Sequence, residues 1–481
     1  MPSLFTLFSL LGVFFVSLQT AVAGIPGKIY GVNLGSWLVL EAWMLPQEWL
    51  DMGGERCDDC STCVATEFAF AQAHPKTVDS VFNKHWTTWF TQDDVNKLKA
   101  AGINTVRVPL GYWLVEGLVD RKTEFFPRGG ILQLRRGLKQ LKDAGMQVIL
   151  DHHALPGVQT AGQMFTGRCT NDVEFYTDYN YHRALVWTAV MTAISHLHSD
   201  FSSVFAIQAV NEEIMDADQT PGYGDFTKNF VRTVRAVELA LGISVPGESP
   251  FVSIAAGANF TSTISAAVSA SVTLNNKIFT PEVRAALRDA IPLLVEVSNQ
   301  LGLGFDLSSS LRHREPLVTT FMDINWQFNN PANPADAAIG PQGYDNHLYY
   351  SFGGVADANE QAYMESICNL NRVQADAALG NSPLWFGEWA LPTQFAASDE
   401  FLFKWADAQK LAYSEGRGWI FWNFKIEISD LAGDTARQWS YLEGLKRGYL
   451  TQDPSQVHNP HVCDPYKNVS TAAVKRHLRR K

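Results

Sequence analysis

The strongest constraint on the fold of this chain is a regular alternation of two patterns along its length. Short apolar runs rich in β-branched and aromatic residues recur, and segments with apolar residues three and four positions apart lie between them. Such alternation is typical of a parallel sheet built from βα units. Eight runs can be recognised, which favours an α/β fold, a (β/α)8 TIM barrel with loop insertions. A doubly wound open sheet is the alternative, but no glycine-rich phosphate loop follows the first run.

The expected elements can be placed by residue number. We expect strands over 29–33, 104–109, 147–153, 204–212, 344–350, 384–389 and 418–424, with the fifth strand at either 251–256 or 318–324. We expect helices over 91–101, 130–144, 181–197, 225–241, 358–379 and 400–414. Residues 261–314 interrupt the alternation and contain a helical pattern of their own. We interpret them as an insertion, either a lid over the site or a surface decoration.

The first 23 residues resemble a secretory signal. Residues 4–16 are apolar, and Ala21-Val22-Ala23 has the small residues that signal peptidase accepts. A membrane anchor is the alternative, but the apolar run is short for a bilayer span and contains Thr6 and Ser9. We therefore expect a secreted, extracellular or cell-wall protein in which residues 24–481 form one catalytic domain.

The cysteines also bear on the compartment in which the protein works. There are six: Cys57, Cys60, Cys63, Cys169, Cys368 and Cys463. An even number suits three disulfides in an oxidising compartment, although the sequence leaves their pairing open. A metal site at the first three is disfavoured because no fourth thiol or imidazole follows at zinc-finger spacing. Asn259 and Asn468 begin glycosylation acceptor patterns, which are consistent with secretion.

Net charge limits the partners. A formal charge of −11 argues against nucleic acid, because the phosphate backbone would be repelled. No segment after the signal is long and apolar enough for a membrane span, and the basic residues over 475–481 are interpreted as a solvated end. We expect no nucleic acid, no membrane, no metal and no organic cofactor, and a monomeric chain.

Polar residues cluster where the expected strands end, which is where a TIM barrel has its active site. They are Arg107, Asp151-His152-His153, Asn211-Glu212-Glu213, His347, Tyr349, Glu388-Trp389 and Trp422. Glu212 and Glu388 each close an apolar strand, and a carboxylate is costly to bury unless it is paired or used. Glycoside hydrolysis needs two carboxyl groups, one protonated and one ionised. Either glutamate alone would be a salt-bridged strand end, but the pair favours a site.

Six short motifs in the chain resemble glycoside hydrolase family 5, and within it the fungal exo-β-1,3-glucanase group. They are GVNLGSWLVLE at 31–41, INTVRVPLGYW at 103–113, DHH at 151–153, NE at 211–212, FGEW at 386–389 and GWIFWNFK at 418–425. The resemblance runs from about residue 29 to residue 456 and leaves the insertion unmatched.

The resemblance implies roles for the catalytic residues. Glu212 matches the family's general acid/base, and Glu388 matches its nucleophile. Arg107 matches the arginine that keeps the nucleophile ionised, and Tyr349 matches a residue that hydrogen-bonds the same carboxylate.

It also implies four substrate-binding residues. Asn211 is placed to hold a sugar 2-hydroxyl. His153 and His347 match two family histidines, one that contacts substrate hydroxyls and one near the acid/base. Trp422 matches the aromatic platform on which the sugar stacks.

Two departures from the family pattern stand beside the motifs. Glu213 replaces a common proline after the acid/base, and strand alternation predicts that it points away from the cleft. His152 is an extra histidine in the third-strand motif and is expected to face away from the barrel interior. The cysteine loop after Trp43 and the insertion also differ from the plainest pattern, which bears on substrate more than on mechanism. Five further tryptophans are candidates for the cleft: Trp37, Trp43, Trp113, Trp326 and Trp389.

We therefore predict a secreted retaining β-glycosidase that acts on a β-glucan or glucoside by double displacement, most closely an exo-β-1,3-glucanase. A β-1,6-glucanase, a rutinosidase-like diglycosidase, a glycolipid β-glucosidase and a transglycosylase are alternatives on the same scaffold. A catalytically silent carbohydrate-binding barrel and a structural wall protein are alternatives from other classes.

Overall fold

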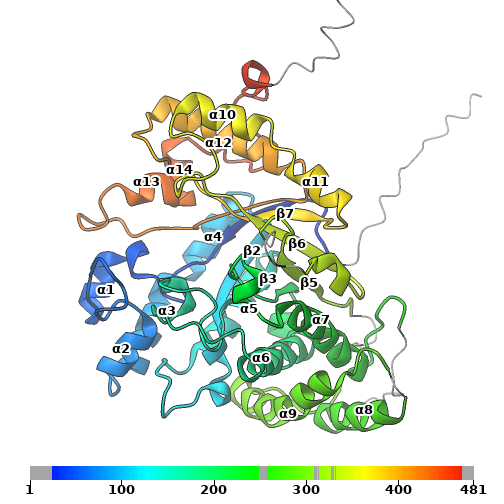
Figure 1. The fold of residues 1–481 in the computed structure, drawn as a ribbon. Helices are drawn as coiled ribbons and strands as arrows, with labels where there is room; N and C mark the ends of the chain where they lie inside the picture. The colour runs from blue at the N-terminus through cyan, green and yellow to red at the C-terminus, as the bar shows by residue number, and fades with distance from the viewer. Residues whose placement is uncertain are drawn as a thin grey trace, which may run out of the picture.

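The (β/α)8 prediction is confirmed. The computed structural model describes residues 24–248, 257–274, 276–307, 311, 314–326, 330 and 332–467. In it, eight parallel strands form a closed barrel in which each strand pairs with the next along the chain and β8 pairs with β1. Helices surround the strands (Figure 1). The open sheet is excluded because the ladder closes on itself.

The strands agree closely with the expected ranges. They are β1 (Ile29–Asn33), β2 (Thr105–Gly111), β3 (Gln147–Ala154), β4 (Val204–Gln208), β5 (Val318–Met322), β6 (Gln342–His347), β7 (Leu384–Glu388) and β8 (Gly418–Phe421). The fifth strand is the later of its two candidates, and the earlier one, 251–256, lies outside the described residues. The expected extension of β4 to Glu212 is wrong. Glu212 has a φ of 47°, a left-handed conformation that a pleated strand does not contain.

The helices follow the expected order with one correction. They are α1 (Pro46–Met52), α2 (Glu67–Ala73), α3 (Val78–Trp89), α4 (Gln92–Ala100), α5 (Gly130–Asp143), α6 (Asp178–Leu197), α7 (Tyr223–Ala240), α8 (Phe260–Leu274), α9 (Pro281–Leu301), α10 (Glu360–Cys368), α11 (Arg372–Ala378), α12 (Asp399–Tyr413), α13 (Thr435–Trp439) and α14 (Tyr441–Arg447). The single helix expected over 358–379 is two, α10 and α11. Asn369 ends the first and Asn371 precedes the second, and asparagine favours such boundaries over helix interiors.

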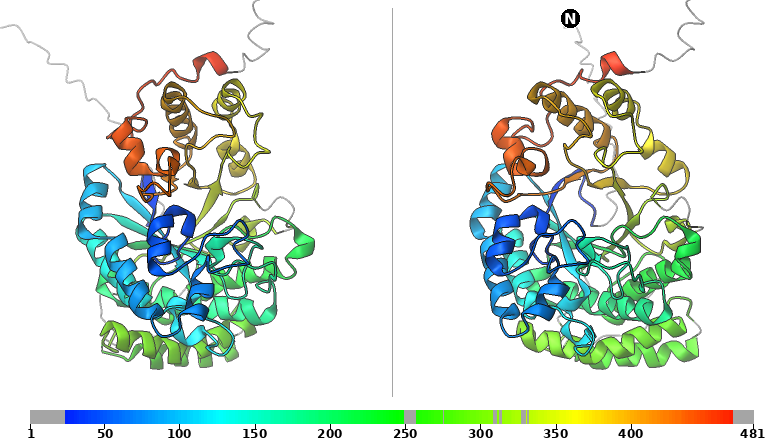
Figure 2. Two further views of the ribbon diagram at one scale, coloured as in Figure 1. Left: turned by 90° about the vertical axis from the view of Figure 1, so that its left-hand side faces the viewer. Right: turned by 60° about the vertical axis from the view of Figure 1, so that its left-hand side comes forward.

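The insertion folds as α8 and α9, which lie along the outside of α6 and α7 (Figures 1 and 2). Asp289 of α9 is 2.8 Å from the His182 ring of α6, and Arg135 of α5 donates to the Leu301 carbonyl at 3.0 Å. The described part of the insertion therefore belongs to the outer helical layer. Across the described ranges, no helix has the length and apolar character needed to span a bilayer.

All six cysteines are paired, which confirms the three expected disulfides. The pairs are Cys57–Cys63, Cys60–Cys169 and Cys368–Cys463. The second joins the loop after β1 to the loop after β3, and the third joins α10 to the C-terminal segment. The second and third disulfides thus join segments that are far apart in the sequence.

Removal of one of these disulfides tests how much they stabilise the barrel. Cys368 and Cys463 are 95 residues apart, whereas Cys57 and Cys63 are 6 apart. A longer closed loop restricts the unfolded chain more. We therefore expect replacement of both Cys368 and Cys463 by serine to lower the unfolding free energy by ~5 kcal/mol, and replacement of both Cys57 and Cys63 to lower it by ~2 kcal/mol. Guanidinium unfolding curves measure both. Equal losses would contradict the chain-entropy explanation.

Candidate active site

A buried arginine lies at the centre of the strand ends. Arg107 in β2 is fully buried inside the barrel. Its register partner in β1, Asn33, accepts a hydrogen bond from Nη1 at 2.9 Å. Gln208 at the end of β4 accepts from Nε at 3.0 Å, and Asn211 accepts from Nη2 at 2.7 Å. Three amide side chains from two strands and one loop thus orient the guanidinium group.

Three carboxylates surround the same guanidinium. Glu388 Oε1 lies 2.8 Å from Nη1, Asp151 Oδ2 lies 3.0 Å from Nη2, and Asp345 Oδ2 lies 3.7 Å from Nε. Burial acts to lower the pKa of Arg107, but these charges outweigh it and hold the pKa above its usual value. Burial likewise acts to raise the pKa of Asp151, and the Arg107 and His153 charges bring it below its usual value. Arg107 is therefore a permanent cation that the strand ends share.

Glu388 is the last residue of β7 and faces this cation. Its second carboxylate oxygen, Oε2, accepts a hydrogen bond from the Tyr349 hydroxyl at 2.9 Å. Burial is the largest influence on the carboxyl and raises its pKa, while the His347 and Arg107 charges act in the opposite direction. Both oxygens of Glu388 are thus held in place by donors, one on each side.

Glu212 lies in the loop just after β4, opposite Glu388. Its left-handed backbone is rare for a residue other than glycine and is held by the Thr160 hydroxyl, which donates to its carbonyl oxygen at 2.6 Å. Its carboxylate Oε1 lies 2.7 Å from His347 Nδ1. Backbone strain of this kind concentrates at functional sites because the surrounding structure must enforce it.

His347 stands between the two glutamates. It ends β6, and the β6–β7 ladder shifts register there so that His347 pairs with Glu388. Its Nδ1 is 3.5 Å from Glu388 Oε2, in addition to the contact with Glu212. Burial acts to lower the pKa of His347, but the Glu388 and Asp345 charges raise it to about 10. An imidazolium therefore separates the two carboxyl groups at neutral pH.

The two carboxyl groups are close together. One nitrogen of His347 and one oxygen from each of Glu212 and Glu388 all lie within 4.8 Å of one another. Such a set has the atom types that bind divalent cations, but each of these residues already bonds to the others or to Arg107. A second candidate metal group, around Cys60 and Cys169, contains a disulfide and so offers no thiolate.

His153 and Trp422 form one wall of the site. His153 Nδ1 is 2.6 Å from Asp151 Oδ2, and the ring is stacked on Trp422 with centroids 5.6 Å apart and an interplanar angle of 7°. Gly35 is required behind Trp422 because a Cβ there would lie 3.0 Å from the indole. His153 Nε2 is buried without a partner in the described chain, and such atoms mark places where a ligand completes the bonding.

Glu41 and Trp43 are additional site residues. Trp43 Nε1 donates to Glu41 Oε2 at 3.0 Å, and the other oxygen of Glu41 is buried without a hydrogen bond within the described ranges. Burial raises the pKa of Glu41 to about 7, although His153 acts against it. Glu41 is the last residue of the first motif but lies well beyond the end of β1 at Asn33, so its place in the motif was the signal that could have identified it.

The candidate tryptophans divide between core and site. Trp37, Trp113 and Trp389 are buried in the core, so their expected place at the cleft is wrong. Trp43 is at the site, and Trp326 packs edge-on against His347 with centroids 5.7 Å apart. Sequence reasoning missed Trp439, which contacts Trp43 and Tyr349. Trp439 follows no strand, so only its tertiary position reveals it.

The two departures from the motif pattern point outward. His152 stacks on Trp187 of α6 with centroids 3.8 Å apart, and burial lowers its pKa to about 3. Burial and then the Glu213 charge raise the pKa of Tyr223 in α7, which places Glu213 toward that helix. Strand alternation explains the outward position of His152 in β3, whereas Glu213 lies beyond the end of β4 and reaches its expected orientation through the turn at Glu212.

Three comparisons place the chain among known proteins. A family model described as "Cellulase (glycosyl hydrolase family 5)" matches residues 71–427. A glucan endo-1,6-beta-glucosidase B from Emericella nidulans is 28% identical over 450 residues, which are 91% of this chain and 88% of the relative. A probable glucan 1,3-beta-glucosidase A from Aspergillus fumigatus is 38% identical over only 133 residues, 28% of this chain and 30% of the relative. The crystal structure of rutinosidase from Aspergillus niger covers 88% of this chain and 97% of its own, with a TM-score of 0.56 and 17% identity.

Replacement of the central cation tests its structural role. We expect Arg107→Met to lose about 3–5 kcal/mol of unfolding free energy, because it leaves three buried carboxylates without their partner. Lys404→Met is the control, since its ion pair with Glu400 is exposed on both sides and contributes at most ~1 kcal/mol. Chemical unfolding measures both variants. A loss in Arg107→Met no greater than that of the control would refute the central role of Arg107.

The pH dependence of stability follows from buried carboxyls with raised pKa values. Burial raises the pKa of Glu41 to about 7 and that of Glu67 to about 8, from 4.5. Their stabilising protonated forms are fully present below pH 4.5 and are lost as pH rises through these values. We therefore expect the unfolding free energy to fall between about pH 4.5 and pH 8, and to fall less steeply in Glu67→Gln. A flat profile for the wild type over this range would contradict the assignment.

Proposed function

Because this chain belongs to glycosyl hydrolase family 5 and is a glycoside hydrolase acting on β-glycosidic bonds, we propose that it is a secreted, retaining β-glucanase that cleaves β-1,6-linked glucan. The observation that carries the chemistry is the separation of Glu212 and Glu388, whose carboxyl oxygens approach within 4.8 Å. Retaining enzymes hold their two carboxyl groups about 5–5.5 Å apart, whereas inverting enzymes leave about 6.5–9.5 Å for a water molecule.

In the first step, Glu388 attacks the anomeric carbon of the sugar. The Arg107 and Tyr349 hydrogen bonds, one on each oxygen, align the carboxylate and stabilise its ionised form. Glu212 carries its proton on the oxygen that His347 does not contact, and passes that proton to the departing glycosidic oxygen, while His347 keeps its own proton on Nδ1. The bond from the anomeric carbon to that oxygen breaks as the bond to Glu388 forms.

In the second step, water releases the sugar from Glu388. Glu212, now ionised, removes a proton from the water as its oxygen attacks the anomeric carbon. The second displacement restores the original anomeric configuration. His347 stabilises the ionised Glu212 between the two steps, because its Nδ1 is 2.7 Å from that carboxylate.

The walls of the site suit a glucosyl ring. Trp422 offers an aromatic face for stacking, and His153 Nε2 and Glu41 are buried polar groups available to sugar hydroxyls. Arg107 donates to Asn211 Oδ1, which leaves the amide NH2 group as a donor toward the 2-hydroxyl. These contacts hold the anomeric carbon between the two glutamates.

The preference for β-1,6 linkages replaces the exo-β-1,3 prediction made from the motifs. The relative named for 1,6-linked glucan is similar over 91% of this chain, whereas the relative named for 1,3-linked glucan is similar over 28%. Full-length similarity includes the loops that shape substrate subsites, and a short match does not. The relative from Emericella nidulans is named an endo-acting glucosidase, and we extend the proposal to internal bonds of the polymer.

Hydrolysis of two polymers tests this proposal. We expect kcat/KM on pustulan, a β-1,6-glucan, to exceed that on laminarin, a β-1,3-glucan, by about tenfold or more, because a site built for one linkage leaves polar groups unpaired with the other. Glu388→Gln should abolish activity on both. Glu212→Gln should lose about 10²–10⁴-fold on pustulan and much less in release of dinitrophenol from its β-glucoside, a leaving group that needs no proton.

Glu213→Gln is the matched control, because this neighbouring carboxyl faces α7, and it should keep wild-type kcat. Preference for laminarin would overturn the linkage. Equal losses in Glu212→Gln and Glu213→Gln would overturn the acid/base assignment.

A further inference from the structure

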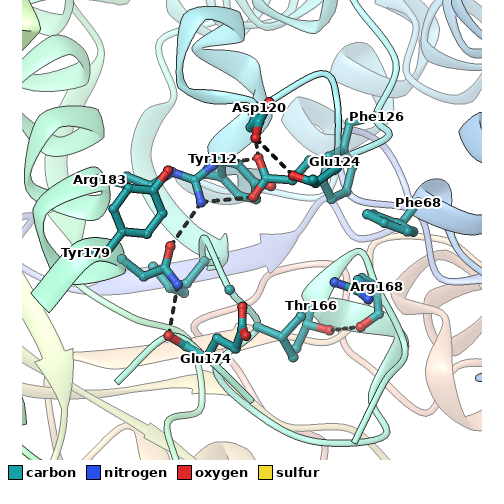
Figure 3. A pocket seen from close by; sticks show the side chains of 15 residues that line it. Phe68, Tyr112, Asp120, Glu124, Phe126, Thr166, Arg168, Glu174, Tyr179 and Arg183 are labelled. Carbon is teal, nitrogen blue, oxygen red and sulfur yellow. Dashed lines mark hydrogen bonds and ion pairs between the residues drawn. The ribbon is translucent and has the colours of Figure 1, made fainter. Parts of the chain in front are cut away.

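A cavity lies apart from the catalytic residues, between the loops that follow β2 and β3 (Figure 3). Its volume is about 230 Å³. Residues 112–126, 155–183 and Phe68 of α2 contribute to its lining, and neither Glu212 nor Glu388 does. We infer that this cavity binds one glucosyl unit of a β-glucan chain. The inference rests on the proposed function for the identity of the ligand.

The cavity is the right size for a single sugar ring. Sites for drug-sized ligands have volumes of about 300–1,000 Å³, and 230 Å³ is below that range. A long oligosaccharide would not fit inside it, but one ring with the adjoining bonds leaving through the opening would. A subsite of this kind holds one unit of a polymer and leaves the rest of the chain on the surface.

The charges of the lining nearly balance, with three carboxylates and two guanidinium groups, and Asp120 already accepts from the Lys122 amide and the Thr123 hydroxyl. Arg183 pairs with both oxygens of Glu124 at 2.9 and 2.6 Å, so these two charges compensate each other. Arg168 and Glu174 carry opposite charges, and their charged groups make no hydrogen bond or ion pair to other described residues. A donor and an acceptor are therefore available together. Sugar hydroxyls can satisfy both at once, because each hydroxyl donates and accepts.

Aromatic side chains supply a stacking surface at the cavity. Tyr179 at the start of α6 lines it and is 66% exposed, the kind of ring that solvent covers only partly. The Arg183 guanidinium lies between the Tyr179 and Tyr112 rings, 5.4 and 4.9 Å from their centroids (Figure 3). This contact fixes Tyr179 at the edge of the cavity. An exposed aromatic ring beside unpaired polar groups is how proteins bind the apolar face and the hydroxyls of a pyranose.

The wall that carries Arg168 is rigid before any ligand arrives. The Arg168 guanidinium covers the Phe68 ring at 4.5 Å, and the Phe68 amide donates to the Gly167 carbonyl at 3.1 Å. The next residue, Cys169, forms the disulfide with Cys60. Binding therefore costs little ordering of this wall, which favours affinity.

One loop joins the cavity to the acid/base. Val158 lines the cavity with a φ of 64°, which is rare for a β-branched residue. The next two side chains support the catalytic loop: Gln159 donates to the Asn211 carbonyl at 3.0 Å, and Thr160 donates to that of Glu212. Strain is kept where the surroundings enforce it for a purpose. The cavity and the catalytic groups thus lie on two sides of a single loop.

Affinity electrophoresis tests this inference. The full chain carrying Glu388→Gln is run in gels containing pustulan or laminarin, so that binding is measured without hydrolysis. We expect Tyr179→Ala and Arg168→Gln, added to that background, each to weaken retardation by pustulan about fivefold, the effect of one lost stacking or polar contact. Leu132→Ala on α5 is the matched control, because Leu132 is 45% exposed and does not line the cavity. Loss with laminarin as well would extend the site to β-glucosyl units in general.

The outcomes separate this inference from the proposed function. Tyr179→Ala and Arg168→Gln variants that bind pustulan as tightly as the Leu132→Ala control would overturn the inference, even where the wild type hydrolyses pustulan. Retardation that depends on Tyr179, in a protein whose wild type hydrolyses neither glucan, would support the inference and reject the hydrolase proposal. Thermal unfolding of each variant shows whether the cavity variants remain folded.

Discussion

The site depends on one buried positive charge. Arg107 cannot lose its proton at any pH at which the protein folds, and inside the barrel its charge requires counter-charges within reach. Glu388, Asp151 and Asp345 supply them from three different strands. Because all four groups lie on strands of one closed ladder, the register of the barrel itself sets their distances.

The charge balance around Arg107 explains the rest of the arrangement. Arg107 and His347 provide two positive charges, while the ionised forms of Glu388, Asp151 and Asp345 provide three negative ones. Burial is the main reason that the pKa of Glu41 rises to about 7, and the Glu388 charge acts in the same direction. The excess of negative charge suits a reaction whose transition state is an oxocarbenium cation, since fixed charges stabilise the charge that develops.

Most of the fold could be predicted from the sequence, because the alternation of apolar runs with helical patterns directly indicates where strands and helices lie. The boundary of β4 could not, since the left-handed turn at Glu212 results from tertiary contacts such as the Thr160 bond. The predicted helix over 358–379 is divided at Asn369 and Asn371, because asparagine favours helix boundaries, and the apolar pattern alone did not reveal this.

The rule that polar residues at strand ends form the active site also brought together the proposed catalytic residues. The rule missed Trp439, which follows no strand. It also could not tell that Trp37 and Trp389 lie in the core and not in the wall of the cleft, because residue type alone does not determine how deeply a tryptophan is buried. The linkage that we propose differs from that of the β-1,3 group, because the motifs cover the strand ends and not the loops that shape substrate subsites.

The central claim is that the Glu388 carboxylate forms a covalent bond with the sugar. Incubation with 2,4-dinitrophenyl 2-deoxy-2-fluoro-β-glucoside, whose fluorine slows the second displacement, tests it most directly, followed by mass spectrometry of the digested protein. The account predicts one fluoroglucosyl group per chain, on the peptide that contains Glu388, with release of one equivalent of dinitrophenol. A label on another carboxylate, or turnover of the reagent to the α-configured sugar with no label, would contradict it.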